Sequence, residues 1–236
     1  MRTNEERQVI AIDGPSASGK STVARGVASQ LGWLYVDSGA LYRSLTWKAV
    51  RAGIDAGDEA GLAEMADRTA VDFLVRNGAV VFKVDGEEPS DSLRGPEVNR
   101  NVSRVAAIPA VRKMAVRNLR QLSRLGSLVM EGRDIGTGVF PEAEHKFYLD
   151  AAPEERARRR HAEIRGGDAP VSVASVNADL RRRDEVDRSR GMDPLRVADA
   201  AVVIDSTGLG ATDVIRLILD KVSMPSGGAL SGKDTR

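Results

Sequence analysis

The sequence predicts an α/β fold: a doubly wound parallel sheet between two layers of helices, with a small inserted β-containing subdomain and a short helical lid. Short apolar runs bounded by turn or polar residues recur at 9–12, 33–36, 127–130, 146–149 and 200–204. They are continuous rather than alternating, as is typical of parallel strands buried on both faces. Helix-patterned stretches separate them, at 20–31, 39–52, 97–106, 110–125, 153–165, 172–189 and 211–222. This alternation is typical of a three-layer α/β sandwich.

One segment departs from the alternation. Two strand-like runs, 71–75 and 80–84, flank Asn77-Gly78. Both residues of this dipeptide tolerate positive φ, which favours a tight antiparallel hairpin. We therefore divide a single domain, 8–222, into a core (8–57 and 107–222), an insert (about 58–106) and a lid (about 156–190). The tail, 223–236, is rich in glycine and serine and is predicted to be disordered.

Composition narrows the class of protein. The chain has 236 residues, of which 42% are hydrophobic, enough for one sizeable core. Its net charge of +1 provides no global basic field for nucleic acid. Cysteine is absent, which excludes disulfides and thiolate metal sites. The polar N-terminus is unlike a signal peptide, and no apolar stretch approaches a membrane span, so we expect a cytoplasmic protein without membrane contact.

The stretch GPSASGKS, Gly14 to Ser21, matches G-x-x-x-x-G-K-[ST] between a predicted strand and a predicted helix. Its glycines let backbone N–H groups turn around an anion, and the helix start adds a positive dipole end. Lys20 supplies a charge for β and γ phosphates, and the Ser21 hydroxyl is a ligand for Mg²⁺. An incidental Gly/Ser-rich turn would not require this position between strand and helix. We therefore predict an ATP-binding loop made of Gly14, Pro15, Ser16, Ala17, Ser18, Gly19, Lys20, Ser21 and Thr22.

A phosphate-binding loop occurs in kinases, GTPases and motor ATPases alike. The Asn-Lys pair of a guanine-binding motif is absent from this sequence, and translocating ATPases are normally longer, so a small-molecule kinase is favoured. Such a kinase brings two phosphorylated anions together. Each unit-charge pair at 4 Å repels by about 4 kcal/mol at an effective dielectric near 20. The site therefore needs cations, and arginine suits it because its fork binds phosphate bidentately.

Three arginine-bearing stretches meet this need. Arg43 follows the second predicted strand, and Arg133 with Asp134 follows the 127–130 run, so both stretches lie at the carboxyl edge of the sheet. Arginines at 156–160 and 181–190 flank a loop containing Gly166, Gly167 and Pro170, which resembles a lid. Simpler interpretations remain open: a helix cap at Asp37 or Ser38, a surface turn with a local ion pair at 133–134, and a solvated charged face on the arginine helices.

Together these motifs resemble the bacterial cytidylate kinases of the nucleoside monophosphate kinase family. The resemblance covers Val9 to about Val222 in family order and rests on the hairpin insert and on IDGPSASGKST, YVDSGALYR, VSRVAAIPAVR, GRDIGTGVFP, FYLDA, EERARRR, RRDEVDRSR and VIDSTG. Gly138 departs from the pattern, because the family more often has an aliphatic residue there.

The resemblance implies phosphoryl transfer from ATP to CMP or dCMP with Mg²⁺, by a monomer that binds no nucleic acid. It implies that Ser103, Arg112 and Asp134 bind cytosine, that Ser38 and Asp187 hold the sugar, and that Arg43, Arg133, Arg183 and Arg190 bind phosphates. Lys20, Arg133, Arg183 and Arg190 are the implied catalytic residues. On the donor side, Arg156 is expected against adenine, Arg160 near the phosphates, and Ser206, within 205–208, in the adenine pocket.

The chemistry of cytosine fits these residue types. A carboxylate such as Asp134 can accept from the N4 amino group, and Arg112 can donate to N3 or O2. Uracil would set a carbonyl against the same carboxylate. Two other functions stay open: a related kinase for another small acceptor such as shikimate, and an ATP-dependent nucleic-acid-binding regulator that uses the arginine helices. His145 and His161 receive no role.

Overall fold

A computed structural model describes residues 7–164 and 172–223. Its centre is a seven-stranded sheet with the order β3-β4-β2-β5-β1-β6-β7. All neighbouring strands are parallel except β3 and β4. The strands are β1 (Val9–Asp13), β2 (Leu34–Asp37), β3 (Val71–Arg76), β4 (Ala79–Val84), β5 (Leu128–Gly132), β6 (His145–Asp150) and β7 (Val202–Asp205).

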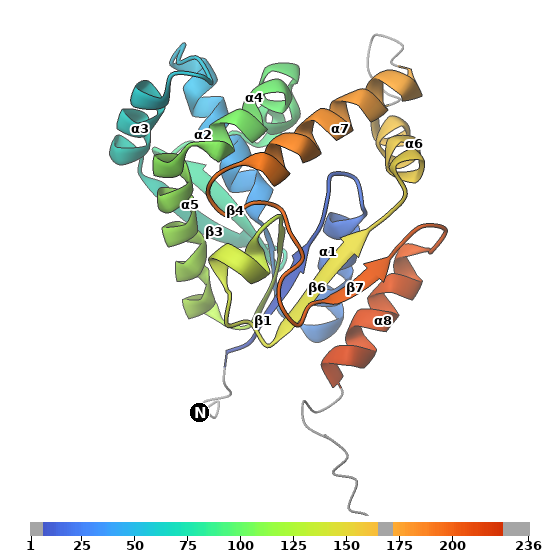
Figure 1. Ribbon diagram of the computed structural model, residues 1–236. Coiled ribbons are helices and arrows are strands. Elements are labelled where there is room, and N and C mark those ends of the chain that lie inside the picture. The colour runs from blue at the N-terminus through green and yellow to red at the C-terminus, as the bar shows by residue number, and fades with distance from the viewer. Residues whose placement is uncertain (1–6, 165–171, 224–236) are drawn as a thin grey trace, which may run out of the picture.

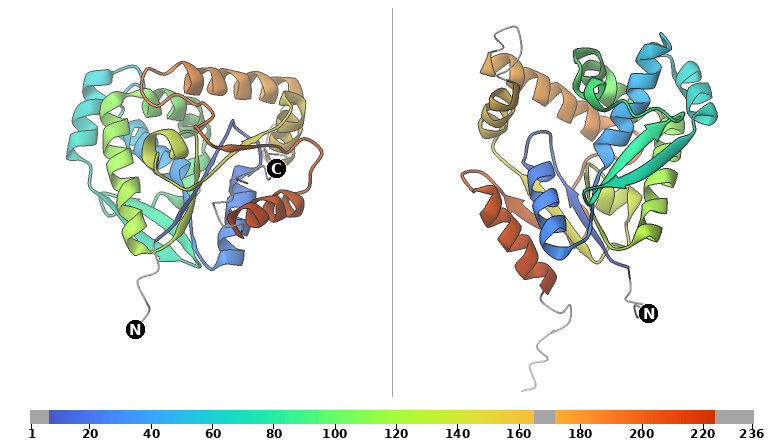
Figure 2. Two further views of the ribbon diagram at one scale, coloured as in Figure 1. Left: turned by 60° about the horizontal axis from the view of Figure 1, so that its bottom comes forward. Right: turned by 180° about the vertical axis from the view of Figure 1, so that it is seen from behind.

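Helices cover both faces of the sheet, as the ribbon views in Figures 1 and 2 show. They are α1 (Lys20–Leu31), α2 (Ser38–Arg51), α3 (Glu59–Arg68), α4 (Pro96–Ala107), α5 (Pro109–Gln121), α6 (Pro153–Ile164), α7 (Val173–Ser189) and α8 (Ala211–Ser223). Short turns occur at η1 (Ser90–Arg94), η2 (Leu122–Leu125) and η3 (Ile135–Val139), the last with π-helical geometry. The predicted three-layer α/β fold is confirmed.

Two hydrophobic cores lie on opposite faces of the sheet. Ala11 packs into the core shared with α2 and α5, whereas its neighbours Ile10 and Ile12 pack into the core shared with α1 and α8. Alternate side chains of one strand point to opposite faces, so β1 must be apolar on both. This arrangement explains why the strand runs are continuous rather than alternating.

Helix α3 is missing from the sequence prediction. Its apolar face consists of Leu62, Met65 and Ala66, all buried, and Asp58 caps it by accepting from the Gly61 amide at 2.9 Å. Glycines at 57 and 61 obscure this short pattern in the sequence, because glycine weakens a helix. The predicted helix over 110–125 is also shorter than expected, since α5 ends at Gln121 and continues as η2.

The predicted hairpin is confirmed. Strands β3 and β4 pair antiparallel, with positive φ at Asn77 (51°) and Gly78 (74°). The hairpin lies at one edge of the central sheet, where β4 meets β2 through the single pair Tyr35 and Ala79. It therefore extends the sheet. The division of the chain into core, insert and lid stays a prediction.

The register of the parallel strands places the carboxyl ends of β1, β2 and β5 at the same edge of the sheet. Asp13 of β1 lies beside Gly132 of β5, and Asp37 of β2 lies beside Glu131 of β5. The segments that follow these strands therefore begin next to one another, as the carboxyl ends of parallel strands require. These segments are the phosphate-binding loop, the start of α2, and residues 133–134.

Helices α6 and α7 pack on each other through Ala157, Val176 and Leu180, and α7 crosses above the carboxyl edge of the sheet in Figure 1. The predicted Gly/Pro loop at 166–170 and residues 224–236 of the predicted disordered tail lie outside the described residues. Within the described part of the chain, no helix is both long and apolar enough to span a bilayer.

Candidate functional site

A cleft of about 410 Å³ opens at the carboxyl edge of β1, β2 and β5. Most of the side chains singled out from the sequence line it, although they come from distant segments. The lining includes Ser16, Ala17, Gly19, Lys20, Ser21, Thr22, Ser38, Arg43, Ser103, Arg133, Asp134, Arg160, Arg183, Asp187 and Arg190. The expected convergence of guanidinium groups opposite the phosphate-binding loop is therefore present.

Residues 14–19 form the phosphate-binding loop between β1 and α1. Gly14 has φ 150°, and a Cβ there would lie 2.0 Å from the Leu149 carbonyl oxygen, so only glycine fits. Gly19, at φ 92°, lets the chain turn into α1. Gly14, Pro15 and Ser18 do not line the cleft and shape the loop from behind. The glycines thus fix the loop conformation, as the motif predicts.

Lys20 is buried at the start of α1. Its Nζ donates to the Pro15 carbonyl oxygen at 2.6 Å and to Ser18 Oγ at 3.3 Å. Burial, together with the nearby Arg133 guanidinium, lowers the pKa of Lys20 to about 7. The ammonium is thus held by neutral oxygens of its own loop, and an anion in the loop would stabilise its charged form.

Ser21 donates from its hydroxyl to Glu131, a buried carboxylate at the end of β5 that the sequence analysis did not single out. Tyr35 Oη donates to the same carboxylate oxygen at 3.2 Å. Burial and the neighbouring Asp37 carboxylate raise the pKa of Glu131. The Ser21 hydroxyl, which we expect to bind Mg²⁺, thus lies near two further side-chain oxygen-bearing groups, those of Glu131 and Tyr35. Oxygen atoms are the ligands that Mg²⁺ prefers.

Arg133 joins the loop to α7. Its Nη2 donates to Ser16 Oγ at 2.7 Å and its Nε to Asp187 Oδ2 at 2.9 Å. Arg183, also on α7, has a buried Nε without a hydrogen-bond partner among the described residues. Burial and Arg133 lower the pKa of Arg183 to about 10. A buried N–H without an acceptor, in a residue that lines the cleft, is a group that a bound anion would satisfy.

Asp134 lies at the centre of an arginine cluster. Arg112 donates to one of its carboxylate oxygens from Nη2, and Arg190 Nη2 donates to the other at 2.9 Å. Burial raises the pKa of Asp134, while both guanidinium groups oppose this effect. Arg112 is fully buried behind Asp134 and does not line the cleft, in contrast to Ser103 and Asp134.

Arg156, which is expected against adenine, does not line the cleft. Its guanidinium is buried beneath the loop, where it pairs with Asp184 and donates to the Ser16 carbonyl oxygen at 3.1 Å. Asp184 Oδ1 also accepts from the Ser16 amide at 3.0 Å. The two residues form a buried brace under the loop and leave no face of Arg156 in the cleft.

Arg159 of α6, to which the sequence analysis gave no role, lies at the outer side of the phosphate-binding loop. Its Nη1 donates to the Ser18 carbonyl oxygen at 3.2 Å and its Nη2 to the Ser206 carbonyl oxygen at 2.7 Å. Ser206 is buried, with its hydroxyl 2.9 Å from the Asp150 carbonyl oxygen. Residues 205–208 therefore lie beside the loop, while Ser206 itself stays outside the cleft lining.

Asp13, the last residue of β1, ties the 133–136 segment to the loop. Its two carboxylate oxygens accept from the Ile135 and Gly136 amides, both at 2.8 Å. Burial raises the pKa of Asp13 to about 7, although the two amides oppose the shift. Asp13 and Glu131 share one signal that could have identified them: an acidic residue at the carboxyl end of an apolar run.

Comparison with known proteins gives the family of the chain. A family model described as cytidylate kinase matches residues 10–224. The chain belongs to the cytidylate kinase family. A cytidylate kinase of Symbiobacterium thermophilum is 44% identical over 93% of this chain and 97% of the relative. One of Solibacter usitatus is 42% identical over 92% and 93%, respectively. The resemblance stated from the motifs is confirmed.

Among solved structures, an uncharacterised protein of Eubacterium ventriosum superposes with a TM-score of 0.50. It is 13% identical to this member of the cytidylate kinase family, over 92% of this chain and 98% of the other. At that identity the likeness concerns the fold alone.

The buried brace gives a test of stability. Asp184→Asn removes the counter-charge of Arg156 without a large change of volume, and we expect the free energy of unfolding to fall by about 3 kcal/mol. Asp179→Asn is a matched control on α7, because Asp179 pairs with Arg182 on the exposed surface. The control should change stability by less than about 0.5 kcal/mol. Equal urea midpoints for the two variants would contradict the brace.

The lowered pKa of Lys20 predicts proton uptake on nucleotide binding. At about pH 8 the free protein holds this amine largely neutral, and phosphates raise its pKa, so binding of Mg·ADP should take up close to one proton. Affinity should therefore decrease as the pH rises above about 7. Calorimetry in Tris and in HEPES, whose ionisation enthalpies differ, measures the uptake. Identical binding enthalpies in the two buffers would refute it.

Proposed function

We propose that this protein transfers the γ-phosphoryl group of ATP to CMP or dCMP, giving ADP and CDP or dCDP. Family membership over residues 10–224 supports this activity. The site assignment rests on the different contacts of two adjacent residues, Arg133 and Asp134. Arg133 contacts Ser16 of the phosphate-binding loop, whereas Asp134 contacts Arg112 and Arg190 on the opposite side. The donor phosphates and the acceptor base thus have separate places in one cleft.

On the donor side, the loop amides, the start of α1 and Lys20 bind the ATP phosphates. Arg160, which lines the cleft from α6, adds charge near them. The oxygen donors around the Ser21 hydroxyl fit Mg²⁺, so Ser21 would hold the ion, with the carboxylate of Glu131 as its neighbour. Bound Mg²⁺ would neutralise charge on the phosphate oxygens. Arg156 acts through Asp184 and the loop rather than by touching adenine.

On the acceptor side, Ser38 and Asp187 would hold the sugar. The guanidinium groups that line the cleft would bind the acceptor phosphate and the transferred group; they belong to Arg43, Arg133, Arg183 and Arg190. The unpaired Nε of Arg183 supports this role, because a phosphate oxygen would satisfy it.

Asp134 and Ser103 would recognise cytosine from the cleft lining, with Arg112 behind them. Each carboxylate oxygen of Asp134 has accepting capacity beyond its arginine partner, so it can accept from the cytosine N4 amino group. Uracil presents a carbonyl oxygen at that place, and the mispaired contact should cost about 1–3 kcal/mol.

The residues act mainly through position and charge. The acceptor phosphate oxygen is already anionic, so the reaction requires no general base. The arginines offset the repulsion between the two substrates and the charge that spreads over the transferred group. Helices α6 and α7 carry Arg160 and Arg183, and Arg190 directly follows α7. The approach of these helices to the loop would complete the set of cations and exclude water.

The remaining parts of the proposal concern context. We propose a monomeric, cytoplasmic enzyme whose partners are nucleotides. A net charge of +1 supports the exclusion of nucleic acid. The family assignment gives no support to a shikimate-type acceptor or to a nucleic-acid regulator.

Base selection tests the proposed acceptor. In an ADP-release assay with ATP and Mg²⁺, CMP and dCMP should have kcat/KM values at least about tenfold above that of UMP, because uracil cannot donate to Asp134. AMP, GMP, dTMP and shikimate serve as further acceptors. Equal values for all nucleotides would remove the cytosine assignment, and turnover of shikimate alone would replace the proposed acceptor.

A substitution at Lys20 tests its proposed role. Lys20→Ala should lower kcat by a factor of about 100 or more, because the ammonium neutralises charge on the transferred phosphate. Lys221→Ala, at an exposed site on α8, is the control and should be unchanged. Thermal melting checks that both variants fold. A folded Lys20→Ala protein with normal turnover would contradict the role.

A further inference from the structure

The segment after α7 contributes a carboxylate to the arginine cluster around Asp134. Asp193 Oδ2 accepts from Arg112 Nε at 3.2 Å, and the Asp193 carbonyl oxygen accepts from Arg190 Nε at 2.7 Å. One residue thus contacts both arginines that hold Asp134. Asp193 lies outside every motif on which the resemblance rests.

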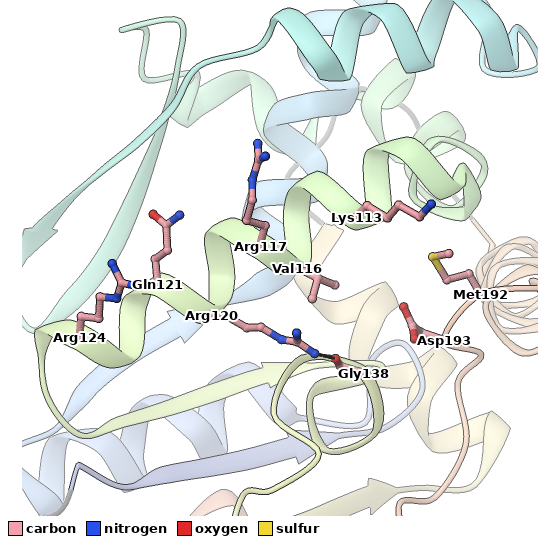
Figure 3. Close-up of a pocket in the computed structure, with 9 residues that line it drawn as sticks. All are labelled: Lys113, Val116, Arg117, Arg120, Gln121, Arg124, Gly138, Met192 and Asp193. Carbon is pink, nitrogen blue, oxygen red and sulfur yellow. Dashed lines mark hydrogen bonds between the residues drawn. The ribbon is translucent and has the colours of Figure 1, made fainter.

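The backbone conformation around Asp193 suits an aspartate and holds it in position. Its φ is 46°, in the left-handed region that aspartate tolerates better than most residues. Two residues later, the Leu195 amide donates to the Asp187 carbonyl oxygen at 2.7 Å and ties the segment to the end of α7. The side chain is 29% exposed, and it faces a groove of about 540 Å³ beside α5 that is separate from the substrate cleft (Figure 3).

Gly138, the departure from the family pattern, lies directly against this carboxylate (Figure 3). A Cβ at position 138 would lie 2.9 Å from Asp193 Cγ and 3.0 Å from Asp134 Oδ2. The Gly138 backbone cannot move aside easily. Its amide donates to the Asp134 carbonyl oxygen at 2.7 Å, and its own carbonyl oxygen accepts from Arg120 Nη2 at 2.8 Å. A side chain there would have to displace one of the two carboxylates.

The negative charge of Asp193 stabilises the buried guanidinium of Arg112. Arg112 is completely buried, and burial of a guanidinium is unfavourable unless acids and acceptors surround it. Asp134 satisfies Nη2, the Ala106 carbonyl oxygen accepts from Nη1 at 3.2 Å, and Asp193 satisfies Nε. With all three nitrogens bound, the guanidinium plane is fixed, and Asp134 keeps one orientation towards the cleft.

We propose that Asp193 is a positioning residue for nucleotide selection: it fixes Arg112 and Arg190 against Asp134, and Gly138 is glycine because it makes room for Asp193. Asp193 acts through the arginines and does not touch the substrate. This inference rests on the proposed function, because Asp134 must be the group that recognises cytosine.

The test compares Asp193→Asn with Asp199→Asn. Asn keeps the size and the tolerance of left-handed φ but removes the charge that holds Arg112. Asp199 is an exposed acid of the same segment and is the matched control. Asp193→Asn should raise KM for CMP about tenfold and reduce the CMP-to-UMP ratio of kcat/KM, because a charge-assisted hydrogen bond is lost. KM for ATP should stay close to that of the control.

A loss that is only structural would raise KM for both substrates equally and leave the CMP-to-UMP ratio of kcat/KM unchanged, and that result would overturn the proposal. So would an Asp193→Asn protein that matches Asp199→Asn in every constant. If wild-type protein fails to phosphorylate CMP, the proposed function falls, and this inference falls with it. If the wild-type protein phosphorylates CMP but Asp193→Asn behaves like Asp199→Asn, the proposed function stands and this inference alone is wrong.

A double-mutant cycle tests the role of Gly138. Gly138→Ala should raise KM for CMP about as much as Asp193→Asn does, since the new Cβ displaces a carboxylate. Asp193→Gly removes the carboxylate and keeps the positive φ without strain. In that background the effect of Gly138→Ala should shrink by about fivefold or more, because the clash with Asp193 is gone. Strictly additive effects would overturn the link between the two residues. If Gly138→Ala does not fold, Asp193→Asn still decides the main claim.

Discussion

The buried carboxylate of Asp13 joins the two halves of the site. It ends the strand from which the phosphate-binding loop starts, and its oxygens accept from the amides of Ile135 and Gly136. Arg133 and Asp134 therefore keep a fixed position relative to the loop. Phosphoryl transfer tolerates little misplacement of donor and acceptor. A short, buried side chain whose two carboxylate oxygens are both bound by backbone amides is a rigid way to meet that demand.

The free protein holds its cations in different ways. Lys20 is bound by oxygens of its own loop, Arg133 by Ser16 and Asp187, and Arg183 Nε lacks a partner among the described residues. Burial opposes the charge of both Lys20 and Arg183. Under the proposed function, substrate phosphates would relieve these unfavourable states, and part of their binding energy would come from satisfying charges that folding has already desolvated.

The sequence was sufficient for features with a local or periodic cause. Continuous apolar runs identified β1, β2, β5, β6 and β7, Asn77-Gly78 located the hairpin, and the glycine spacing located the phosphate-binding loop. Strand order then placed most of the expected side chains in one cleft. Roles implied by resemblance alone depend on side-chain orientation: Ser103, Asp134 and Asp187 line the cleft, whereas Arg112, Arg156 and Ser206 do not.

Arg156 and Arg159 show the limit of helical periodicity. They are three residues apart on α6 and both contact the phosphate-binding loop, Arg156 through Ser16 and Arg159 through Ser18. Periodicity cannot tell which of them is buried beneath the loop, because that depends on how Ala157 packs against α7. Asp193 lies outside the quoted motifs, and Asp184 lies within RRDEVDRSR but received no role; each has a decisive partner far away in the chain, Arg112 for Asp193 and Ser16 for Asp184. Helix α3 was lost for another reason, since its apolar face comprises only Leu62, Met65 and Ala66.

The single pairing of Tyr35 with Ala79 has a consequence for how the molecule opens. The β3–β4 hairpin is held less by the backbone of its neighbour strand than by Val80, Phe82 and Val84, which are buried in the core shared with α2. Its amide hydrogens can exchange with solvent when that apolar contact loosens, while the β2–β5 ladder stays closed. We therefore expect this edge of the sheet to open as a unit of its own, because side-chain packing rather than strand hydrogen bonding attaches it.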